Sequence, residues 1–320
     1  GNELFGMLHA QLTNLNLAEL GGPSPELRLA YANAQSTAAM MGFNRLARRY
    51  ERIAAAEPST EDRTGLQTAA IIRQCTEHII AGQWGRATLL ASRVIDQARA
   101  AHYARREEEG MAMLAYSYFA IGRFHEVQEL ADALHQSASR GDVQSFCWSA
   151  IFKGFGYLAF DQPQLALEAV TSGGAVVDSL PGRAEAINLN ALAAVASLRL
   201  GKTPEASSYA AAALELGRKV GLVVFLDIIP YSYLSQTFLA LADLEQGRAS
   251  AVALSRARTA LRQLERCAQV FPIARPRLEL SRGIFHARSG RPRRAKAGWS
   301  KCGRGARSLE MPLDATYADL

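Results

Sequence analysis

The chain of 320 residues is 49% hydrophobic and 21% charged, with a formal net charge of +6, so it has ample apolar material for a core. It has no run of about 18 apolar residues, which excludes a transmembrane helix by the usual length criterion. Its four cysteines share no short spacing, so we expect reduced thiols and no disulfide framework.

The charge is distributed unevenly along the chain. Between Arg248 and Arg307 there are 16 Lys and Arg but only two acidic residues, Glu265 and Glu279, a local net charge of +14. The remainder holds 20 basic and 28 acidic residues, a net charge of −8. A basic C-terminal part, residues 248–311, thus follows an acidic body. This segregation bears on binding partners and not on the fold.

In chain order, residues 1–22 predict one extra helix, about Leu4–Leu20, and residues 23–320 predict about seven antiparallel helix hairpins. The turn residues recur every 39 to 46 residues, most often 40, at Gly42, Gly82, Gly122, Asp161, Gly201, Gly247 and Gly290. A small residue that would allow close helix packing follows each turn by five positions, at Ala47, Ala87, Val127, Ala166, Ala206, Val252 and Ala295. Such a period predicts an all-α superhelix.

Each hairpin has a first and a second helix. The predicted first helices are about Leu27–Met41, Gly65–Ala81, Arg105–Ile121, Val143–Phe160, Arg183–Leu200, Phe225–Gln246 and Arg277–Ser289. The predicted second helices are about Asn44–Ala56, Arg86–His102, His125–Ser139, Gln164–Thr171, Pro204–Val220, Ala249–Val270 and Pro292–Leu309. We expect Gly173-Gly174 to interrupt the fourth second helix and Pro230 to end or kink the helix around it. A last helix begins at Pro312 and stops at Leu320, so we interpret the chain as a fragment of a longer protein.

With the turns fixed, the hairpins resemble tetratricopeptide repeats, which place a small residue and then an aromatic residue before the turn. Ala115, Tyr118 and Gly122 fit this pattern in the third hairpin, as does Ala131 after the turn. The predicted period of about 40 exceeds the usual 34. In this it resembles the helical-repeat region of large bacterial signalling ATPases, either cyclase-linked or ATP-binding transcription regulators. Residues 141–144 with Trp148, and residues 297–312, carry that second resemblance. It implies a cytoplasmic regulatory module without catalytic residues.

The motifs that could carry chemistry are weak. Gly201-Lys202-Thr203 lacks the first glycine and the strand–loop–helix context of a phosphate-binding loop, so we interpret it as a turn. The six histidines form no HxxxH pair and no cysteine stands at metal-ligand spacing. No Gly-x-Ser-x-Gly elbow occurs. We therefore predict a chain that is not an enzyme and has no metal or cofactor.

The first helices carry an apolar face where a tetratricopeptide superhelix has its concave groove. The candidate binding residues on it are Ile72, Ile79, Tyr116, Phe119, Trp148, Ile151 and Phe155. Two interpretations follow from so apolar a face. In a tightly wound superhelix these side chains are core; in an open one they line a groove for a partner helix or extended peptide.

A second candidate surface is basic. The residues that form it are Arg288, Arg291, Arg293, Arg294 and Lys296. We expect this surface to dock an acidic protein or a neighbouring ATPase or cyclase domain, or to support self-association; nucleic acid is a weaker alternative because no nucleic-acid module is visible. The predicted function is protein–protein or interdomain recognition in a cytoplasmic bacterial signalling protein, with no membrane partner. The alternative is a ligand-sensing domain that encloses a small molecule or peptide in the concave face.

Overall fold

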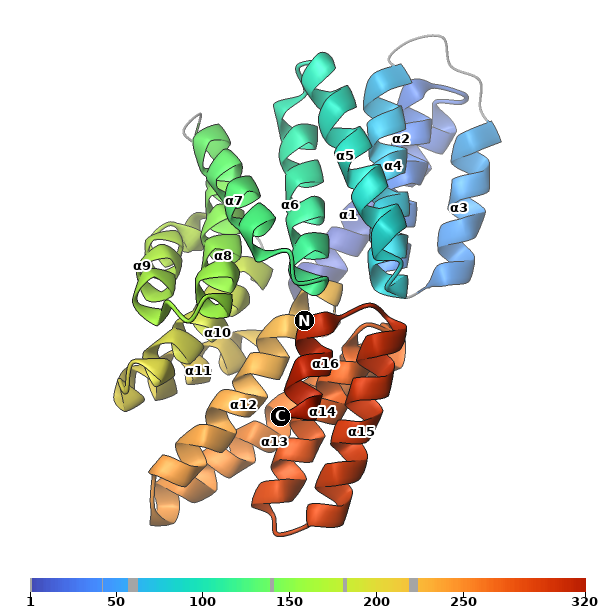
Figure 1. The fold of residues 1–320 in the computed structure, drawn as a ribbon. Coiled ribbons are helices and arrows are strands. Elements are labelled where there is room, and N and C mark those ends of the chain that lie inside the picture. Colours follow the sequence, from blue (N-terminus) through green and yellow to red (C-terminus); the bar gives the residue numbers. More distant parts are fainter. Residues whose placement is uncertain (1, 42, 57–62, 139–140, 181–182, 219–223) are drawn as a thin grey trace. The chain divides into compact units, whose positions relative to one another are not determined.

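The computed structural model describes the chain except residues 1, 42, 57–62, 139–140, 181–182 and 219–223. The described residues form α-helices and two short 3-10 helices, with no β-strand among them (Figure 1). The prediction of an all-α protein is confirmed. The helices up to the middle of the chain are α1 (Asn2–Leu20), α2 (Pro25–Met40), α3 (Asn44–Ala56), α4 (Arg63–Ala81), α5 (Trp84–Ala100), α6 (Ala104–Ala120), α7 (Phe124–Ala138) and α8 (Val143–Ala159).

The second half follows the same alternation of longer helices and short turns. Its helices are α9 (Pro163–Gly174), η1 (Val177–Ser179), α10 (Ala184–Arg199), α11 (Thr203–Arg218), η2 (Phe225–Asp227), α12 (Ile228–Leu244), α13 (Gly247–Val270), α14 (Ala274–Arg288), α15 (Pro292–Ser308) and α16 (Pro312–Asp319). Each predicted hairpin therefore corresponds to a pair of helices, from α2 and α3 to α14 and α15.

The chain divides into two compact units. Unit 1 comprises residues 1–117 and 220–224, and unit 2 comprises residues 118–219 and 225–320, so the division falls inside α6. The predicted boundary between an extra helix, 1–22, and the remainder, 23–320, is a different division and stays a prediction.

In unit 1, α2 is the helix that most others contact. It packs against α1, α3 and α4, and α4 packs against α5. Leu15, Leu27 and Tyr31 are buried together in its core. The Tyr31 ring lies 5.8 Å from the Tyr50 ring of α3. The apolar periodicity of these helices thus buries one face of each against α2.

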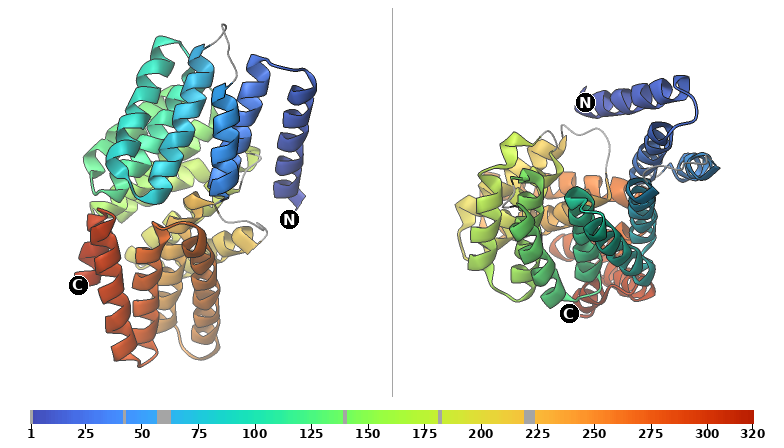
Figure 2. Two further views of the ribbon diagram at one scale, coloured as in Figure 1. Left: turned by 90° about the vertical axis from the view of Figure 1, so that its right-hand side faces the viewer. Right: turned by 90° about the horizontal axis from the view of Figure 1, so that it is seen from above.

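In unit 2, helices pack in chain order from α7 to α16 (Figures 1 and 2). The first helices also pack against one another, α8 on α10, α10 on α12, α12 on α14, and α14 on α16. Each first helix between α10 and α14 is therefore enclosed by its own second helix and by two other first helices. This explains the apolar content of α8 and α12, which are buried on most sides.

The predicted turn residues lie between helices. Those of the second to seventh hairpins all have a positive φ, from 55° at Asp161 to 80° at Gly122. This left-handed conformation explains why glycine recurs at these places. The small residues five positions later are 0% or 1% exposed, except Val252. Gly42 lies outside the described residues.

The sixth hairpin departs from this register. α12 ends at Leu244, and Glu245 and Gln246 connect it to α13, which already begins at Gly247. Gly247 has the positive φ of a turn residue, 57°, but the prediction that Val252 is the packed small residue was wrong. Val252 is 41% exposed, and Ala253, which is 4% exposed, is buried instead. The packed small residue therefore lies one position later than predicted.

Two predicted helix breaks also differ from the structure. Gly173 and Gly174 are the last two residues of α9, so the pair lies at the end of the helix and does not interrupt it. At Gly173 the missing side chain allows close packing: a Cβ there would lie 2.7 Å from the Cβ of Ala150 on α8. Pro230 neither ends nor kinks a helix. It falls in the first turn of α12, where a proline removes no helical hydrogen bond.

Candidate functional site

Most of the seven candidate residues on the first-helix face are buried. Ile79, Phe119 and Phe155 are 0–2% exposed, and Tyr116 and Ile151 are 6% and 7% exposed. Ile72 and Trp148 are half-buried. Ile72, Ile79 and Tyr116 belong to unit 1, and the other four belong to unit 2. The structure therefore does not bring all seven together in one compact unit.

A central aromatic cluster, formed by Phe119, Phe152, Phe155 and Tyr233, fills the space between the first helices of unit 2. Phe119 and Phe155 stack with ring centroids 4.6 Å apart. Phe155 also meets Phe152 at 6.0 Å and Tyr233 at 6.5 Å, both edge to face. These contacts join the end of α6 to α8 and α12. They occupy the ring faces that a bound partner would need.

A buried ion pair adjoins this cluster. Arg277 of α14 donates to the carboxylate of Asp314 on α16 at 3.1 Å, and the two side chains are 7% and 3% exposed. The Arg277 guanidinium also lies 5.7 Å from the centre of the Phe119 ring. Burial raises the pKa of Asp314, while the positive charge of Arg277 opposes that rise. The pair ties the last helix to the end of α6 through side chains that are distant in sequence.

Trp148 has a polar role in the structure. Its Nε1 donates to Glu185 at 3.1 Å, and the Gln144 amide donates to the same carboxylate oxygen at 2.8 Å. Glu185 is 6% exposed. This network joins α8 to α10. Trp148 thus differs from the phenylalanines beside it, since its indole is held by a hydrogen bond as well as by packing.

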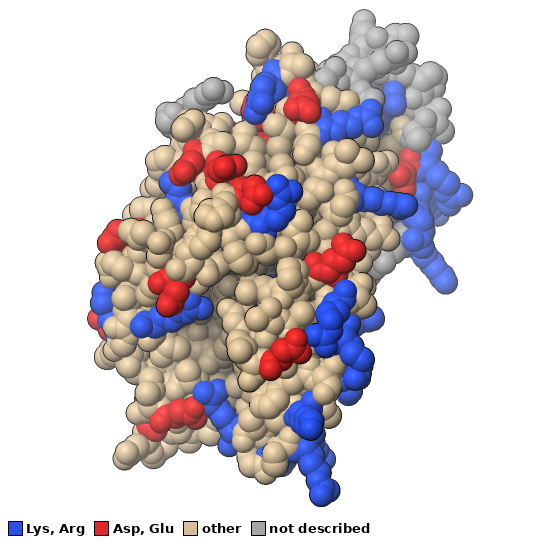
Figure 3. All heavy atoms as spheres, in the orientation of Figure 1, with Lys and Arg blue, Asp and Glu red and all other residues tan. Residues whose placement is uncertain are grey.

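The predicted basic residues are close together at the turn between α14 and α15. Arg288, Arg291, Arg293, Arg294 and Lys296 are all exposed, and we call them the basic face. In the space-filling view, blue groups recur along the region of α15, whereas red and blue are mixed over α8 and α9 (Figure 3). The sequence of α15 contains six Lys and Arg and no acidic residue.

Most of these cations have no acidic partner. Arg288 pairs with Asp243 at 2.5 Å. Among the residues that the structure describes, no ion pair involves Arg291, Arg293, Arg294 or Lys296. The positive charge of the basic face also affects the pKa of the neighbouring His286. Burial lowers its pKa, and Arg294, Arg291 and Arg282 lower it further.

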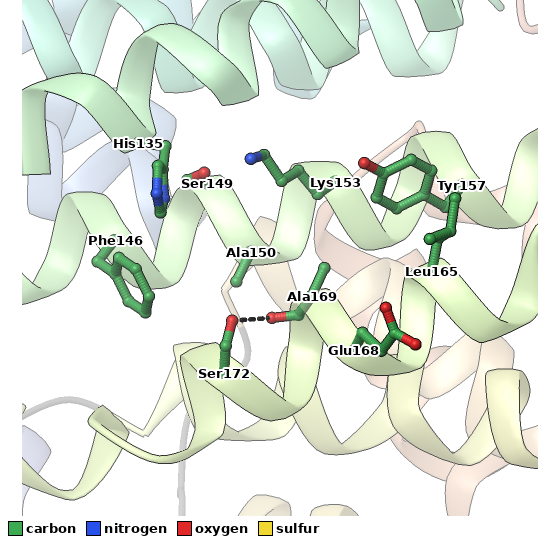
Figure 4. Close-up of a pocket in the computed structure, with 10 residues that line it drawn as sticks. All are labelled: His135, Phe146, Ser149, Ala150, Lys153, Tyr157, Leu165, Glu168, Ala169 and Ser172. Atoms are coloured by element: carbon green, nitrogen blue, oxygen red, sulfur yellow. Dashed lines mark hydrogen bonds between the residues drawn. The ribbon is translucent and has the colours of Figure 1, made fainter.

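Three grooves in unit 2 lie in equivalent places, between two second helices and over a first helix. The first is lined by α7, α8 and α9 and has a volume of about 220 Å³ (Figure 4). Several of its polar groups are already engaged: Lys153 pairs with Asp132 at 2.8 Å, and Ser149 and Ser172 donate to backbone carbonyls.

The other two grooves lie in the basic C-terminal part. One, of about 440 Å³, is lined by α11, α12 and α13 and includes Phe238, Arg248 and Val252. The other, of about 410 Å³, is lined by α13, α14 and α15 and includes Arg275, Leu278 and Lys301. We call the last one the α13–α15 groove. Sequence reasoning missed all three grooves because it placed the groove on the first-helix face and the basic surface at the turn between α14 and α15. For the two grooves of the basic C-terminal part, the one available signal was the excess of Lys and Arg on α13 and α15.

The cysteine thiols, the strongest candidate nucleophiles, are inaccessible. All four cysteines are buried, and burial raises the pKa of Cys147 to about 11 and that of Cys75 and Cys302 to about 12. Lys202 lies in the α10–α11 turn, as predicted for the Gly-Lys-Thr segment. Within the described residues, no group of three or more His, Cys, Asp or Glu could hold a metal ion. No helix in that part of the chain is long and apolar enough to cross a membrane.

No known protein-family model matches the chain, and no curated protein matches it either.

Proposed function

We propose that the chain is a non-catalytic recognition module that binds an acidic protein surface through the basic face of unit 2. The observation that carries the proposal is the set of four exposed cations, Arg291, Arg293, Arg294 and Lys296, that lack acidic partners among the described residues. Exposed charges of one sign repel one another and favour a partner of opposite charge. The acidic remainder of the chain shows the kind of surface that is complementary.

The proposed architecture is a tetratricopeptide-like superhelix with a period of about 40 residues. Its support is the double packing of the first helices in unit 2, each against its own second helix and against the next first helix. Stacked hairpins of this kind are typical of helical-repeat proteins, whose usual role is to present a binding surface. The positive φ values at recurring turns add to this support.

The proposed setting is a regulatory region of a cytoplasmic bacterial signalling protein, with an ATPase or cyclase domain as the neighbour that the basic face docks. This part rests on the resemblance of residues 141–144 and 297–312. Asp142 accepts a hydrogen bond from the backbone N–H of Ser145 at 2.9 Å, so the first of these segments is an N-cap that starts α8.

The test uses fluorescein-labelled poly-L-glutamate as an acidic polypeptide and measures fluorescence anisotropy over a range of salt. We expect binding that weakens as salt rises, because exposed charges are screened over about 10 Å at 0.1 M salt. The triple variant Arg291→Glu, Arg293→Glu, Arg294→Glu should lose this binding. Its circular dichroism should match the wild type, since these side chains are exposed.

The matched control reverses three exposed arginines of unit 1, Arg45, Arg48 and Arg49 on α3. This control has the same net charge as the first variant and should keep most of the binding. Equal losses in both variants would show that only net charge matters and would refute the proposal. So would tighter binding of generic duplex DNA at physiological salt that disappears in the first variant, because that result would favour a nucleic-acid function.

A further inference from the structure

The α13–α15 groove combines an apolar floor with a cationic rim. Its floor includes Ala268, Pro276 and Leu278, and its rim includes Arg275 on α14 and Lys301 on α15, both exposed. Gly305 also lines it and keeps it open, because a longer side chain there would project toward Pro276: the Cβ position lies 3.4 Å from the proline Cγ. The groove is therefore able to hold an apolar side chain with charges beside it.

The two carboxylates in this groove share one arginine. Glu265 and Glu279 both line it, and both pair with Arg282, at 2.5 Å and 3.1 Å. With Arg275 and Lys301 the lining holds three cations and two carboxylates, so it keeps a net charge of +1 that favours an external anion. Arg275 donates to the backbone carbonyl of Ala268 at 3.4 Å, which holds its guanidinium at the rim. No ion pair of Lys301 occurs within the described part of the chain.

The surroundings of the groove add to its positive character. Arg304 stands one helical turn after Lys301 and is exposed. The first turn of α14, which contains Arg275 and Pro276, lies at the groove, and the N-terminal end of a helix favours negative charge. The groove of α7, α8 and α9 lacks this surplus, because its lysine is paired with Asp132.

We propose that the α13–α15 groove binds a short acidic protein segment that places one apolar side chain over Leu278 and its carboxylates beside Arg275 and Lys301. This inference rests on the proposed function and specifies its binding site. The combination of an apolar floor and a cationic rim determines which kind of ligand fits the groove. The apolar floor gains from burying an aliphatic side chain, whereas a free phosphate has no apolar group to place on that floor.

The experiment uses a fluorescein-labelled amphipathic peptide with leucines at helical spacing and glutamates elsewhere, measured by anisotropy. Lys301→Glu should weaken binding by about tenfold or more, because it turns an attractive contact into a repulsive one. Gly305→Leu, which fills the groove without a charge change, should weaken binding to a similar extent. Replacing the glutamates of the peptide with glutamine, or its leucines with alanine, should also reduce affinity.

Matched controls separate this site from general electrostatics. Arg248→Glu reverses an exposed charge at the neighbouring groove, and Gly85→Leu adds the same side chain at an exposed helical glycine of unit 1 with nothing within 4 Å. Both should bind the peptide nearly as the wild type does. Thermal melts should confirm that all four variants are folded. If Gly305→Leu proves unfolded, Gly305→Ala with Lys301→Gln replaces it and should still lose affinity.

The outcomes distinguish this inference from the proposed function. Peptide binding that is unchanged in Lys301→Glu and in the folded groove-filling variant would overturn the groove assignment, even if poly-L-glutamate still binds through the basic face. Equal losses in Lys301→Glu and Arg248→Glu would overturn it too, since the effect would then follow net charge. Loss confined to the groove variants supports it.

Discussion

In unit 2 the first helices and the second helices differ in what they leave exposed. Phe119 and Phe155 come from apolar stripes on first helices, and they are 1% and 2% exposed because their rings stack, with centroids 4.6 Å apart. Lys301 and Arg304 come from a second helix and are exposed. An apolar stripe on a helix therefore does not by itself indicate a binding groove. The grooves of this protein lie where adjacent second helices leave a gap over a first helix.

The largest expected loss of stability comes from removing a ring of the central aromatic cluster. Phe155→Ala should lower the free energy of unfolding by roughly 3–5 kcal/mol, since it deletes a fully buried ring and leaves a cavity. Val252→Ala, at a position that is 41% exposed, should change it by less than about 0.5 kcal/mol. Chemical denaturation measures both. A Phe155→Ala protein as stable as the wild type would show that this side of unit 2 is open.

Breaking the buried ion pair should lower the free energy of unfolding by less, but it tests one specific contact. Arg277→Ala should cost roughly 3 kcal/mol of unfolding free energy, because Asp314 would stay buried without its partner. The double variant Arg277→Met, Asp314→Leu should regain most of that loss, since apolar residues of similar size need no charge partner. Denaturant melts at neutral pH test this. Additive losses in the double variant would contradict the pairing.

The smallest expected effect is a change in the pKa of His286, which senses the charge of the basic face. Burial, Arg294 and Arg291 lower its pKa from an ordinary value of 6.5. The imidazole of His286 binds a proton more readily in the unfolded chain than in the folded one. The contribution of His286 to stability is therefore fully present above its unfolded pKa, and it is lost as the pH falls through the lower, folded pKa. Arg294→Gln should raise the pKa of His286, as read from an NMR titration, because it removes a positive charge that lowers this pKa. Arg304→Gln, on the same helix, should leave the pKa of His286 unchanged. An identical pKa in both variants would show that Arg294 does not act on His286.

Sequence reasoning succeeded where local chemistry decides structure. Gly82, Gly122 and Gly201 identified turns because a left-handed φ favours glycine, and the packed alanines followed from a fixed distance to those turns. It failed in the sixth hairpin, where the packed small residue is Ala253 and not Val252. Gly247 has a positive φ there too, but it is already the first residue of α13, so the distance from the turn to the packed position differs from that in the other hairpins.

Sequence reasoning could not predict contacts between residues that are distant in the chain. Phe119 and Arg277 are far apart in sequence and meet only because α6, α14 and α16 converge in unit 2. The α13–α15 groove likewise combines three helices. A charge count found the basic part of the chain, but it could not show that Arg282 pairs with two carboxylates while Lys301 has no such partner within the described residues.

The central claim, that first helices bury their apolar face while second helices present the binding surface, is tested most directly by thiol labelling. The four native cysteines are buried, and burial raises the pKa of their thiols, so they should give little background. A single cysteine is introduced at Ile151 or at Lys301, and maleimide labelling of the folded proteins is followed by mass spectrometry. The account predicts rapid labelling of Lys301→Cys and almost none of Ile151→Cys until denaturant is added. Equal labelling rates in the folded state would contradict it.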